Sequence, residues 1–321
     1  MKLVAVVGPT ASGKSALALA LAERFGGEVV SCDSTAVYRG LDIGTDKVPA
    51  GAQRGIPHHL VDVADPAEVY SAARYAADAA SLVRAIWHRA RLPILAGGTG
   101  FYYLELVMGL FPGPARDESR RRRLARVAAR RGVEGLHRWV RRVDPESALR
   151  IQPRDQKRLI RALEVYLLTG RPLTAHFEDT ASPIPEADVL SLGVAAGRAE
   201  LADRVSRRVD EQFARGVVAE VRQLLAAGVP ADAHAFSGLV YRQVLDLLRG
   251  VRDEAATREL IIRENLRYAK RQLTWFRHEP GVVWLSGPGD DGRVQDEAVR
   301  LTEAFLDLAS AARPAGGPVA R

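Results

Sequence analysis

The stretch LVAVVGPTASGKS, residues 3–15, decides the fold of this chain. Its apolar, β-branched first half is typical of a buried strand, and its second half matches the pattern G-x-x-x-x-G-K-S. A helix rich in alanine and leucine follows from about Ser15. Strand, loop and helix together form the context that a phosphate-binding loop (P-loop) requires. A glycine-rich turn that matches by chance is the alternative, and the flanking strand and helix argue against it.

A loop of this kind binds anions because successive backbone N–H groups and the N-terminus of the helix point into one concavity. Lys14 adds a positive charge at the terminal phosphate, and the Ser15 hydroxyl can ligate Mg²⁺, so we expect Mg²⁺ as the cofactor. The residues expected to bind a diphosphate or nucleotide are Gly8, Pro9, Thr10, Ala11, Ser12, Gly13, Lys14 and Ser15. The loop indicates a polyphosphate without specifying ATP.

Further apolar runs alternate with helical patterns along the chain. These predicted strands cover residues 28–32, 92–96, 189–194 and 282–285. The alternation predicts an α/β fold, a P-loop NTPase-like parallel sheet flanked by helices. Ligands of such sheets bind beyond the carboxyl ends of the strands. Loops 8–15, 33–36 and 97–100 follow strand ends, so we expect them to converge on one cleft.

The sequence Pro112-Gly113-Pro114 interrupts this alternation. Residues 113–185 then form a basic, all-helical pattern, which predicts an insertion domain within the α/β core. The core comprises residues 1–112 and 186–312, and residues 313–321 are expected to be a disordered tail because they are rich in alanine, glycine and proline.

Composition excludes several classes of protein. The chain has no stretch of about 18 apolar residues, so no membrane partner is expected. The single cysteine, Cys32, excludes an internal disulfide and a cysteine-cluster zinc site. The chain enters a strand directly with no charged leader, so we expect it in the cytoplasm. We also expect a monomer.

The net charge of +7 is concentrated in arginine-rich patches. One patch is the run 120–123, another lies at 157–161, and a third lies at 263–271. Such patches suit a polyanionic partner whose phosphates are neutralised by several cations. A solvated helical face is the alternative, and charge alone does not separate the two.

Asp33 is the strongest candidate for acid–base chemistry, because it follows an apolar strand that ends near the P-loop. A carboxylate there can accept a proton or hold Mg²⁺ through water. The alternative is an aspartate that caps a turn after the strand. Thr99, flanked by glycines in 97–100, can approach a substrate closely in the same region.

Several longer motifs continue the pattern in order. They are GPTASGKS at 8–15, DSTAVYRGLDIGT at 33–45, PHHL at 57–60, GGTGFY at 97–102, DQKRLIRALE at 155–164, YRQ at 241–243 and AKRQLTW at 269–275. Over about residues 3–285 the chain resembles the tRNA dimethylallyltransferase family, of the bacterial type without a zinc finger. That family transfers a dimethylallyl group from dimethylallyl diphosphate to N6 of adenosine 37, in tRNAs that read codons beginning with U.

The resemblance implies roles for named residues. Asp33 would be the general base, and Lys14 and Thr99 would complete the catalytic set. Apart from the resemblance, Arg208 or Arg222, on the helices expected at 198–227, would add to the diphosphate clamp. The residues implied to contact tRNA are Asp33, Ser34, Thr35, Ala36, Thr99, Arg121, Lys157, Arg158, Leu159, Ile160, Arg161, Ser237, Gly238, Leu239, Val240, Tyr241 and Arg242. Thr35-Ala36, Lys157 and Val240 depart from the residues usual in the family.

Three other functions remain open from the residues. A P-loop nucleoside or nucleotide kinase would hold a polyphosphate in the same way but would form ADP. A P-loop RNA-binding or regulatory protein would bind RNA without modifying a base. A relative that prenylates free adenine nucleotides would not need the large basic insertion.

Overall fold

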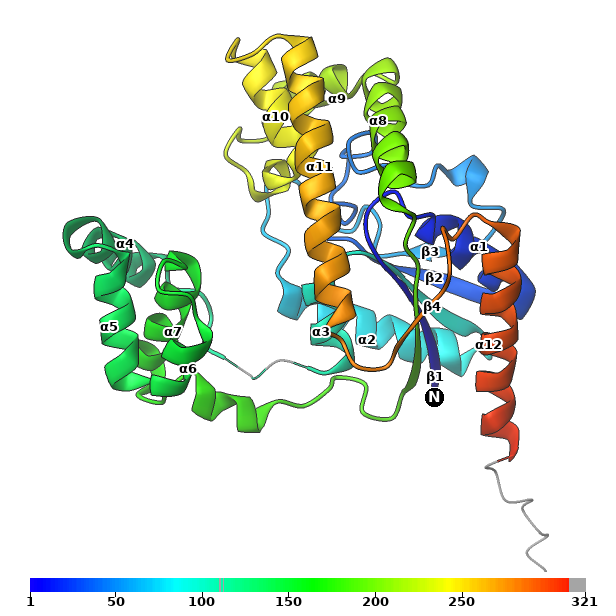
Figure 1. Cartoon of the computed structure of the whole chain (residues 1–321), viewed down its shortest axis with the longest axis horizontal. Helices are drawn as coiled ribbons and strands as arrows, with labels where there is room; N and C mark the ends of the chain where they lie inside the picture. The colour runs from blue at the N-terminus through cyan, green and yellow to red at the C-terminus, as the bar shows by residue number, and fades with distance from the viewer. Residues whose placement is uncertain (110, 112, 312–321) are drawn as a thin grey trace, which may run out of the picture. The chain divides into compact units, whose positions relative to one another are not determined.

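The computed structural model describes residues 1–109, 111 and 113–311, and its centre is one six-stranded, all-parallel sheet (Figure 1). The strand order is β3-β2-β4-β1-β5-β6. The strands are β1 (Lys2–Val7), β2 (Gly27–Cys32), β3 (His58–His59), β4 (Leu92–Gly97), β5 (Asp188–Gly193) and β6 (Val282–Trp284). The predicted α/β class is confirmed. Among the strands of the described residues, sequence analysis did not predict β3, because a strand of two residues shows no hydrophobic periodicity.

The strands are continuous apolar runs because helices cover the sheet. Helices α1 (Lys14–Phe25) and α12 (Gly292–Ala311) share one core with strand side chains such as Val4 and Ile94. Helix α1 contributes Leu17 to this core, and α12 contributes Val294. Helix α2 (Ala72–His88) packs on β2 and β4 and begins at Ser71, whose hydroxyl accepts a hydrogen bond from the Arg74 N–H.

The remaining helices of this part of the chain surround the strand ends. They are α3 (Gly100–Val107), α8 (Arg198–Ala214), α9 (Val217–Ala226), α10 (Leu239–Leu248) and α11 (Glu254–Arg277), with short 3₁₀ turns at Ala50–Ala52 and His234–Ser237. The long helix α11 packs against both α8 and α10 (Figure 1). It brings Arg271 and Gln272 to the loops that follow β1 and β4.

The chain divides into two units. The first comprises residues 1–106 and the chain from 186 onwards, and the second comprises residues 107–185. The sequence placed this boundary at 112–113, six residues later, because it relied on Pro112 and Gly113 rather than on the end of α3. The tail assigned to 313–321 lies outside the described residues.

The second unit is entirely helical. Its helices are α4 (Glu118–Arg131), α5 (Val133–Val143), α6 (Pro145–Arg150) and α7 (Gln156–Thr169), followed by the 3₁₀ segment Thr174–Asp179. Aspartates 117, 144 and 155 cap α4, α6 and α7. Leu124, Leu136, Val140 and Leu163 form its own hydrophobic core.

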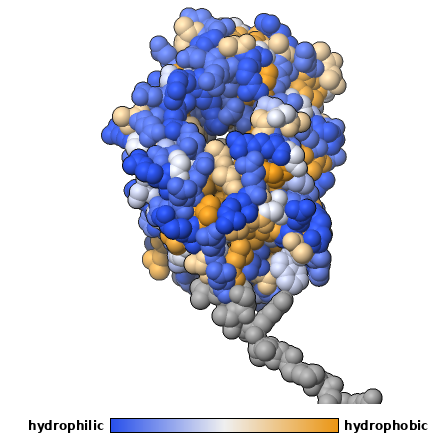
Figure 2. Space-filling model, turned by 90° about the vertical axis from the view of Figure 1, so that its right-hand side faces the viewer, coloured by the Kyte–Doolittle hydropathy of each residue, from blue (hydrophilic) through white to orange (hydrophobic). Residues whose placement is uncertain are grey.

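No helix within 1–109 and 113–311 is long and apolar enough to cross a membrane. The face drawn in Figure 2 is mostly hydrophilic, with apolar side chains in small groups.

Candidate functional site

A cleft of about 880 Å³ lies where loops leave the carboxyl ends of β1, β2 and β4. It is lined by residues 10–15, 33–36 and 97–98, together with side chains from α8, the segment 237–241 and α11. The structure therefore brings together the three loops that the sequence expected to converge. Gly8 and Pro9 do not line the cleft, although they shape the loop.

Backbone geometry explains the glycines of the P-loop. A Cβ atom on Gly8 would lie 2.2 Å from the Val194 carbonyl oxygen, and Gly13 has a φ of 84° beside Asp290. Neither position accommodates a side chain without a shift of the neighbouring chain. The loop is closed by hydrogen bonds to the Pro9 carbonyl oxygen, which accepts from Ser12 Oγ at 2.9 Å and from Lys14 Nζ at 2.5 Å.

The protonation state of Lys14 depends on whether an anion is bound beside it. Burial, and secondly the positive charge of Arg208, lower the pKa of Lys14 to about 7. A bound diphosphate would stabilise the ammonium form and raise this pKa again. Anion binding and protonation of Lys14 are therefore linked.

We predict that pyrophosphate binding takes up protons at Lys14. At pH 7 about half of the unliganded sites are neutral, so up to about 0.5 proton per site is taken up, falling towards zero below about pH 6, where Lys14 is already charged. Calorimetry in two buffers with different ionisation enthalpies measures this number. Lys14→Arg stays charged throughout, so it reports the protons contributed by pyrophosphate itself. If the wild type and Lys14→Arg took up the same number of protons, pyrophosphate binding would not be linked to protonation of Lys14.

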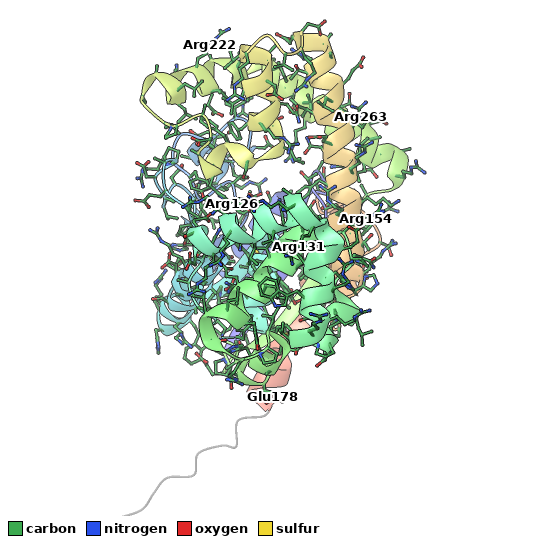
Figure 3. The ribbon with its side chains drawn as sticks, turned by 90° about the vertical axis from the view of Figure 1, so that its left-hand side faces the viewer. Arg126, Arg131, Arg154, Glu178, Arg222 and Arg263 are labelled. Carbon is green, nitrogen blue, oxygen red and sulfur yellow. The ribbon has the colours of Figure 1, made fainter. Side chains whose placement is uncertain are left out.

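Two long side chains connect the P-loop to the rest of the cleft. Gln272 on α11 accepts from the Thr10 N–H and donates to the Gly98 carbonyl oxygen, both at 2.8 Å. Arg208 on α8 donates to Thr10 Oγ1 at 2.7 Å. Arg222, the other expected clamp residue, is exposed on α9 and does not line the cleft (Figure 3).

The geometry of Asp33 is compatible with both roles that the sequence offered as alternatives. Its Oδ1 accepts from the Thr35 N–H at 2.8 Å, the Thr35 hydroxyl at 2.6 Å and the Ala36 N–H at 3.3 Å, which is a turn cap. Its Oδ2 has no hydrogen-bond partner within the described chain and remains available in the cleft. One oxygen thus orients the carboxylate while the other can accept a proton.

Thr99 contacts the turn that follows β2, and Cys32 precedes this turn in the core. Thr99 Oγ1 accepts from the Ser34 N–H at 3.1 Å and does not line the cleft, so its position is that of a support for the turn. Cys32 is fully buried, and this burial raises the pKa of its thiol to about 12. The thiol therefore packs and stays protonated.

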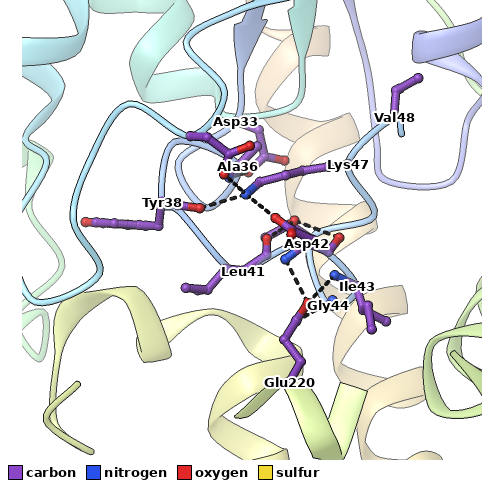
Figure 4. A network of polar contacts seen from close by, with 12 residues as sticks. Asp33, Ala36, Tyr38, Leu41, Asp42, Ile43, Gly44, Lys47, Val48 and Glu220 are labelled. Carbon is purple, nitrogen blue, oxygen red and sulfur yellow. Dashed lines mark hydrogen bonds and ion pairs between the residues drawn. The ribbon is translucent and has the colours of Figure 1, made fainter. Parts of the chain in front are cut away.

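A network of polar contacts holds the segment 38–47 in place (Figure 4). Glu220 Oε2 accepts from the N–H groups of Asp42 at 2.9 Å and Ile43 at 2.7 Å, and its Oε1 accepts from the Tyr241 hydroxyl at 2.7 Å. Lys47 donates to the Tyr38 carbonyl oxygen at 2.7 Å and to Asp42 and Asp62. Sequence reasoning missed Glu220, which lies far along the chain from the loop it holds.

The residues at 237–242, which the resemblance implies to contact tRNA, differ in their exposure and in whether they line the cleft. Ser237, Gly238 and Leu239 are exposed or half-buried and line the cleft beside the P-loop residues. Val240 and Tyr241 also line it but are buried, and the Tyr241 hydroxyl is bound to Glu220. Arg242 lies outside the cleft lining and pairs with Glu264 at 2.8 Å.

In the second unit, two arginines implied to contact tRNA converge on one buried carboxylate. Glu164 Oε2 lies 3.1 Å from Arg121 Nη1 and 3.0 Å from Arg161 Nη1, and Oε1 accepts from the Asp117 N–H. Glu164 is fully buried, whereas both arginines are partly exposed. The carboxylate therefore fixes two cations on one surface of this unit.

Two expectations in the second unit need correction. Leu159 and Ile160 are buried in the hydrophobic core, so their side chains are not available to tRNA. Their neighbours Lys157 and Arg158 are exposed. A helix turns by about 100° per residue, so a continuous stretch of it cannot present every side chain to one partner.

We predict that Glu164→Gln destabilises the second unit by about 1–3 kcal/mol, because a buried charge partner of two arginines is lost. Chemical denaturation measures this change. Glu178→Gln, at an exposed position of the same unit (Figure 3), is expected to change stability little. Equal effects of the two substitutions would show that the Glu164 network does not stabilise the unit.

Further arginines of this unit are exposed. Arg126 and Arg131 on α4 and Arg154 before α7 are exposed (Figure 3). Side chains of this kind contact phosphates without reading sequence.

The residues of the P-loop suit a magnesium ion that takes most of its ligands from the phosphates of a bound substrate. Ser15 is exposed in the cleft, and within the described chain its hydroxyl has no hydrogen-bond partner. No group of three or more histidine, cysteine, aspartate or glutamate side chains that could hold a metal occurs among the described residues. Mg²⁺ bound to phosphates needs only one or two protein ligands, so Ser15, and Asp33 through water, suffice.

Comparison with known proteins gives one consistent result. Residues 36–279 match the model of the family described as IPP transferase. The chain is 47% identical over 309 residues to the tRNA dimethylallyltransferase of Solibacter usitatus, covering 95% of this chain and 99% of the relative. It is 42% identical over 300 residues to the same enzyme of Geobacter sulfurreducens, covering 94% and 96%.

Solved structures agree. The full-length tRNA isopentenylpyrophosphate transferase of Bacillus halodurans superposes with a TM-score of 0.72 at 37% identity, covering 97% of this chain and 98% of that one. A eukaryotic dimethylallyltransferase acting on tRNA superposes with a TM-score of 0.80 at 25% identity, covering 100% and 82%.

Proposed function

This chain belongs to the IPP transferase family, and on that premise we propose that it transfers a dimethylallyl group from dimethylallyl diphosphate to tRNA. The acceptor is N6 of adenosine 37 in tRNAs that read codons beginning with U, the other product is pyrophosphate, and the enzyme acts as a monomer. Transfer to tRNA is supported by the names of the relatives. The observation that carries the chemistry is the cleft in which the P-loop and the free Oδ2 of Asp33 lie together.

The donor supplies much of the reactivity by releasing its leaving group. The exocyclic amine of adenine is a weak nucleophile because its lone pair is delocalised into the ring. The allylic C–O bond therefore breaks as positive charge develops on the allyl carbon, and pyrophosphate takes the electron pair. The backbone N–H groups of the P-loop, Lys14 and Arg208 stabilise the negative charge on this leaving group, which is commonly the largest catalytic contribution in such sites.

Asp33 completes the reaction. As N6 forms its bond to the allyl carbon, Asp33 Oδ2 accepts the proton that the amine loses. The hydrogen bonds of Oδ1 to Thr35 and Ala36 keep the carboxylate oriented throughout. Mg²⁺ ligated by Ser15 would neutralise charge on the diphosphate when it is bound.

The acceptor must reach this cleft from a structured RNA. An adenine in the anticodon loop has to leave its stack before N6 can approach Asp33. Arg121 and Arg161, fixed by Glu164, with the exposed Lys157 and Arg158, form a surface suited to the RNA backbone.

One incubation separates this function from its rivals. Purified protein is mixed with dimethylallyl diphosphate, Mg²⁺, unmodified tRNA, ATP and AMP, and both the tRNA nucleosides and the free nucleotides are analysed by mass. We expect a five-carbon addition at adenosine 37 only. A phosphorylated nucleotide instead would indicate the kinase, RNA binding without modification would indicate a regulatory protein, and modification of free AMP in place of tRNA would indicate the nucleotide prenyltransferase.

A further inference from the structure

The carboxylate of Asp46 lies between two arginines in the wall of the cleft. Its Oδ2 accepts a hydrogen bond from Arg208 Nη2, and its Oδ1 lies 3.4 Å from Arg215 Nη1. The other terminal nitrogen of Arg208, Nη1, donates to Thr10 Oγ1 at 2.7 Å. A single guanidinium therefore joins the P-loop to a carboxylate that belongs to another loop of the cleft.

The loop that carries Asp46 is anchored so that this carboxylate faces α8. Asp46 has a φ of 55°, in the left-handed region that most side chains avoid. The preceding residues are held by Glu220, and Gln212 on α8 donates to the Gly44 carbonyl oxygen at 3.2 Å. Arg208 and Gln212 are four residues apart and lie on one face of α8. The same helix face thus anchors the loop and meets its carboxylate.

A guanidinium binds carboxylate and phosphate oxygens through the same donor edges. The Arg208 edge that faces Asp46 is therefore the kind of surface that a diphosphate oxygen also requires. The other charged residues of α8 that line the cleft are Arg204, which pairs with Asp290 at 3.0 Å, Arg207 and Glu211. Asp46 is distinguished from Asp290 because its arginine partner also touches the P-loop.

We propose that Asp46 is a positioning residue that holds Arg208 beside Thr10 until a diphosphate oxygen replaces the carboxylate. The inference rests on the proposed function, since it assumes a diphosphate in the P-loop. The negative charge of Asp46 remains close to the bound anion and weakens its binding. Asp46 therefore sets the KM for the donor and favours release of pyrophosphate after transfer.

The test is the affinity of Asp46→Asn for inorganic pyrophosphate with Mg²⁺, measured by calorimetry. Asparagine keeps the size of the side chain, tolerates a positive φ and removes the charge. Since one unit charge a few ångströms away in a wet site is worth about 1 kcal/mol, we expect pyrophosphate to bind about fivefold more tightly. The KM for the donor falls by a similar factor, whereas the KM for tRNA is unchanged.

Asp42→Asn is the matched control. Asp42 lies on the same loop and pairs with Lys47, but it does not line the cleft. This variant is expected to bind pyrophosphate as the wild type does. When Arg208 is replaced in Arg208→Gln, Asp46→Asn is expected to increase the affinity for pyrophosphate much less. The Arg208 guanidinium, which Asp46→Asn would free to bind pyrophosphate, is then absent. Asp46→Ser, a second way to remove the charge, replaces Asp46→Asn if the latter folds poorly.

Unchanged or weaker binding of pyrophosphate by the folded, charge-free Asp46 variant would overturn this inference and leave the proposed function intact. A wild-type protein that binds no pyrophosphate would instead contradict the proposed function itself.

Discussion

Asp33→Asn is expected to lower turnover by at least about 10²-fold, while the affinity for tRNA changes less than about threefold. The asparagine amide oxygen can still accept from the Thr35 and Ala36 N–H groups, so the turn after β2 is kept. It cannot take the proton from N6. Single-turnover rates with saturating donor and tRNA measure the loss, and a filter-binding assay measures tRNA affinity.

Asp65→Asn is the control for this substitution. Asp65 caps a similar turn by accepting from the Ala67 N–H at 2.9 Å, and it does not line the cleft. We expect its activity to equal that of the wild type. An Asp33→Asn enzyme with near-normal turnover would remove Asp33 from the role of general base, whatever its effect on folding.

Lys14→Met is expected to lower kcat/KM for the donor by about 10²–10³-fold, because one of the main positive charges facing the leaving group is lost. The loss should appear in kcat as well as in KM, since charge on the diphosphate increases as the C–O bond breaks. Steady-state kinetics with varied donor measure both constants.

Lys2→Met serves as the comparison for Lys14→Met, because Lys2 begins β1 at the opposite end of the strand and pairs with Asp188 at 3.1 Å. It should leave the kinetic constants unchanged. If Lys14→Met raised only KM, the lysine would bind the donor without assisting its departure.

The sequence predicted the fold and the P-loop because these depend on local patterns. Residues 8–15 carry their glycines, lysine and serine within one loop, and the strand and helix beside them are periodic. The convergence of 33–36 and 97–98 on this loop followed from a general property of parallel sheets. These parts of the site required no knowledge of distant contacts.

The parts that sequence reasoning missed are long-range. Glu220, Gln272 and Asp46 act through partners that are more than 160 residues away along the chain. No spacing or periodicity marks such pairs. Leu159 and Ile160 were assigned to the tRNA surface for a different reason. A continuous motif was treated as a continuous surface, although successive residues of a helix point about 100° apart.

In the proposed reaction the P-loop binds a leaving diphosphate and does not take part in phosphoryl transfer. The most direct test supplies the enzyme with tRNA, Mg²⁺, dimethylallyl diphosphate and ATP together, and counts both products in one reaction. We expect one pyrophosphate released per prenylated adenosine and no conversion of ATP to ADP. Formation of ADP in step with a phosphorylated product, without consumption of the five-carbon donor, would contradict it.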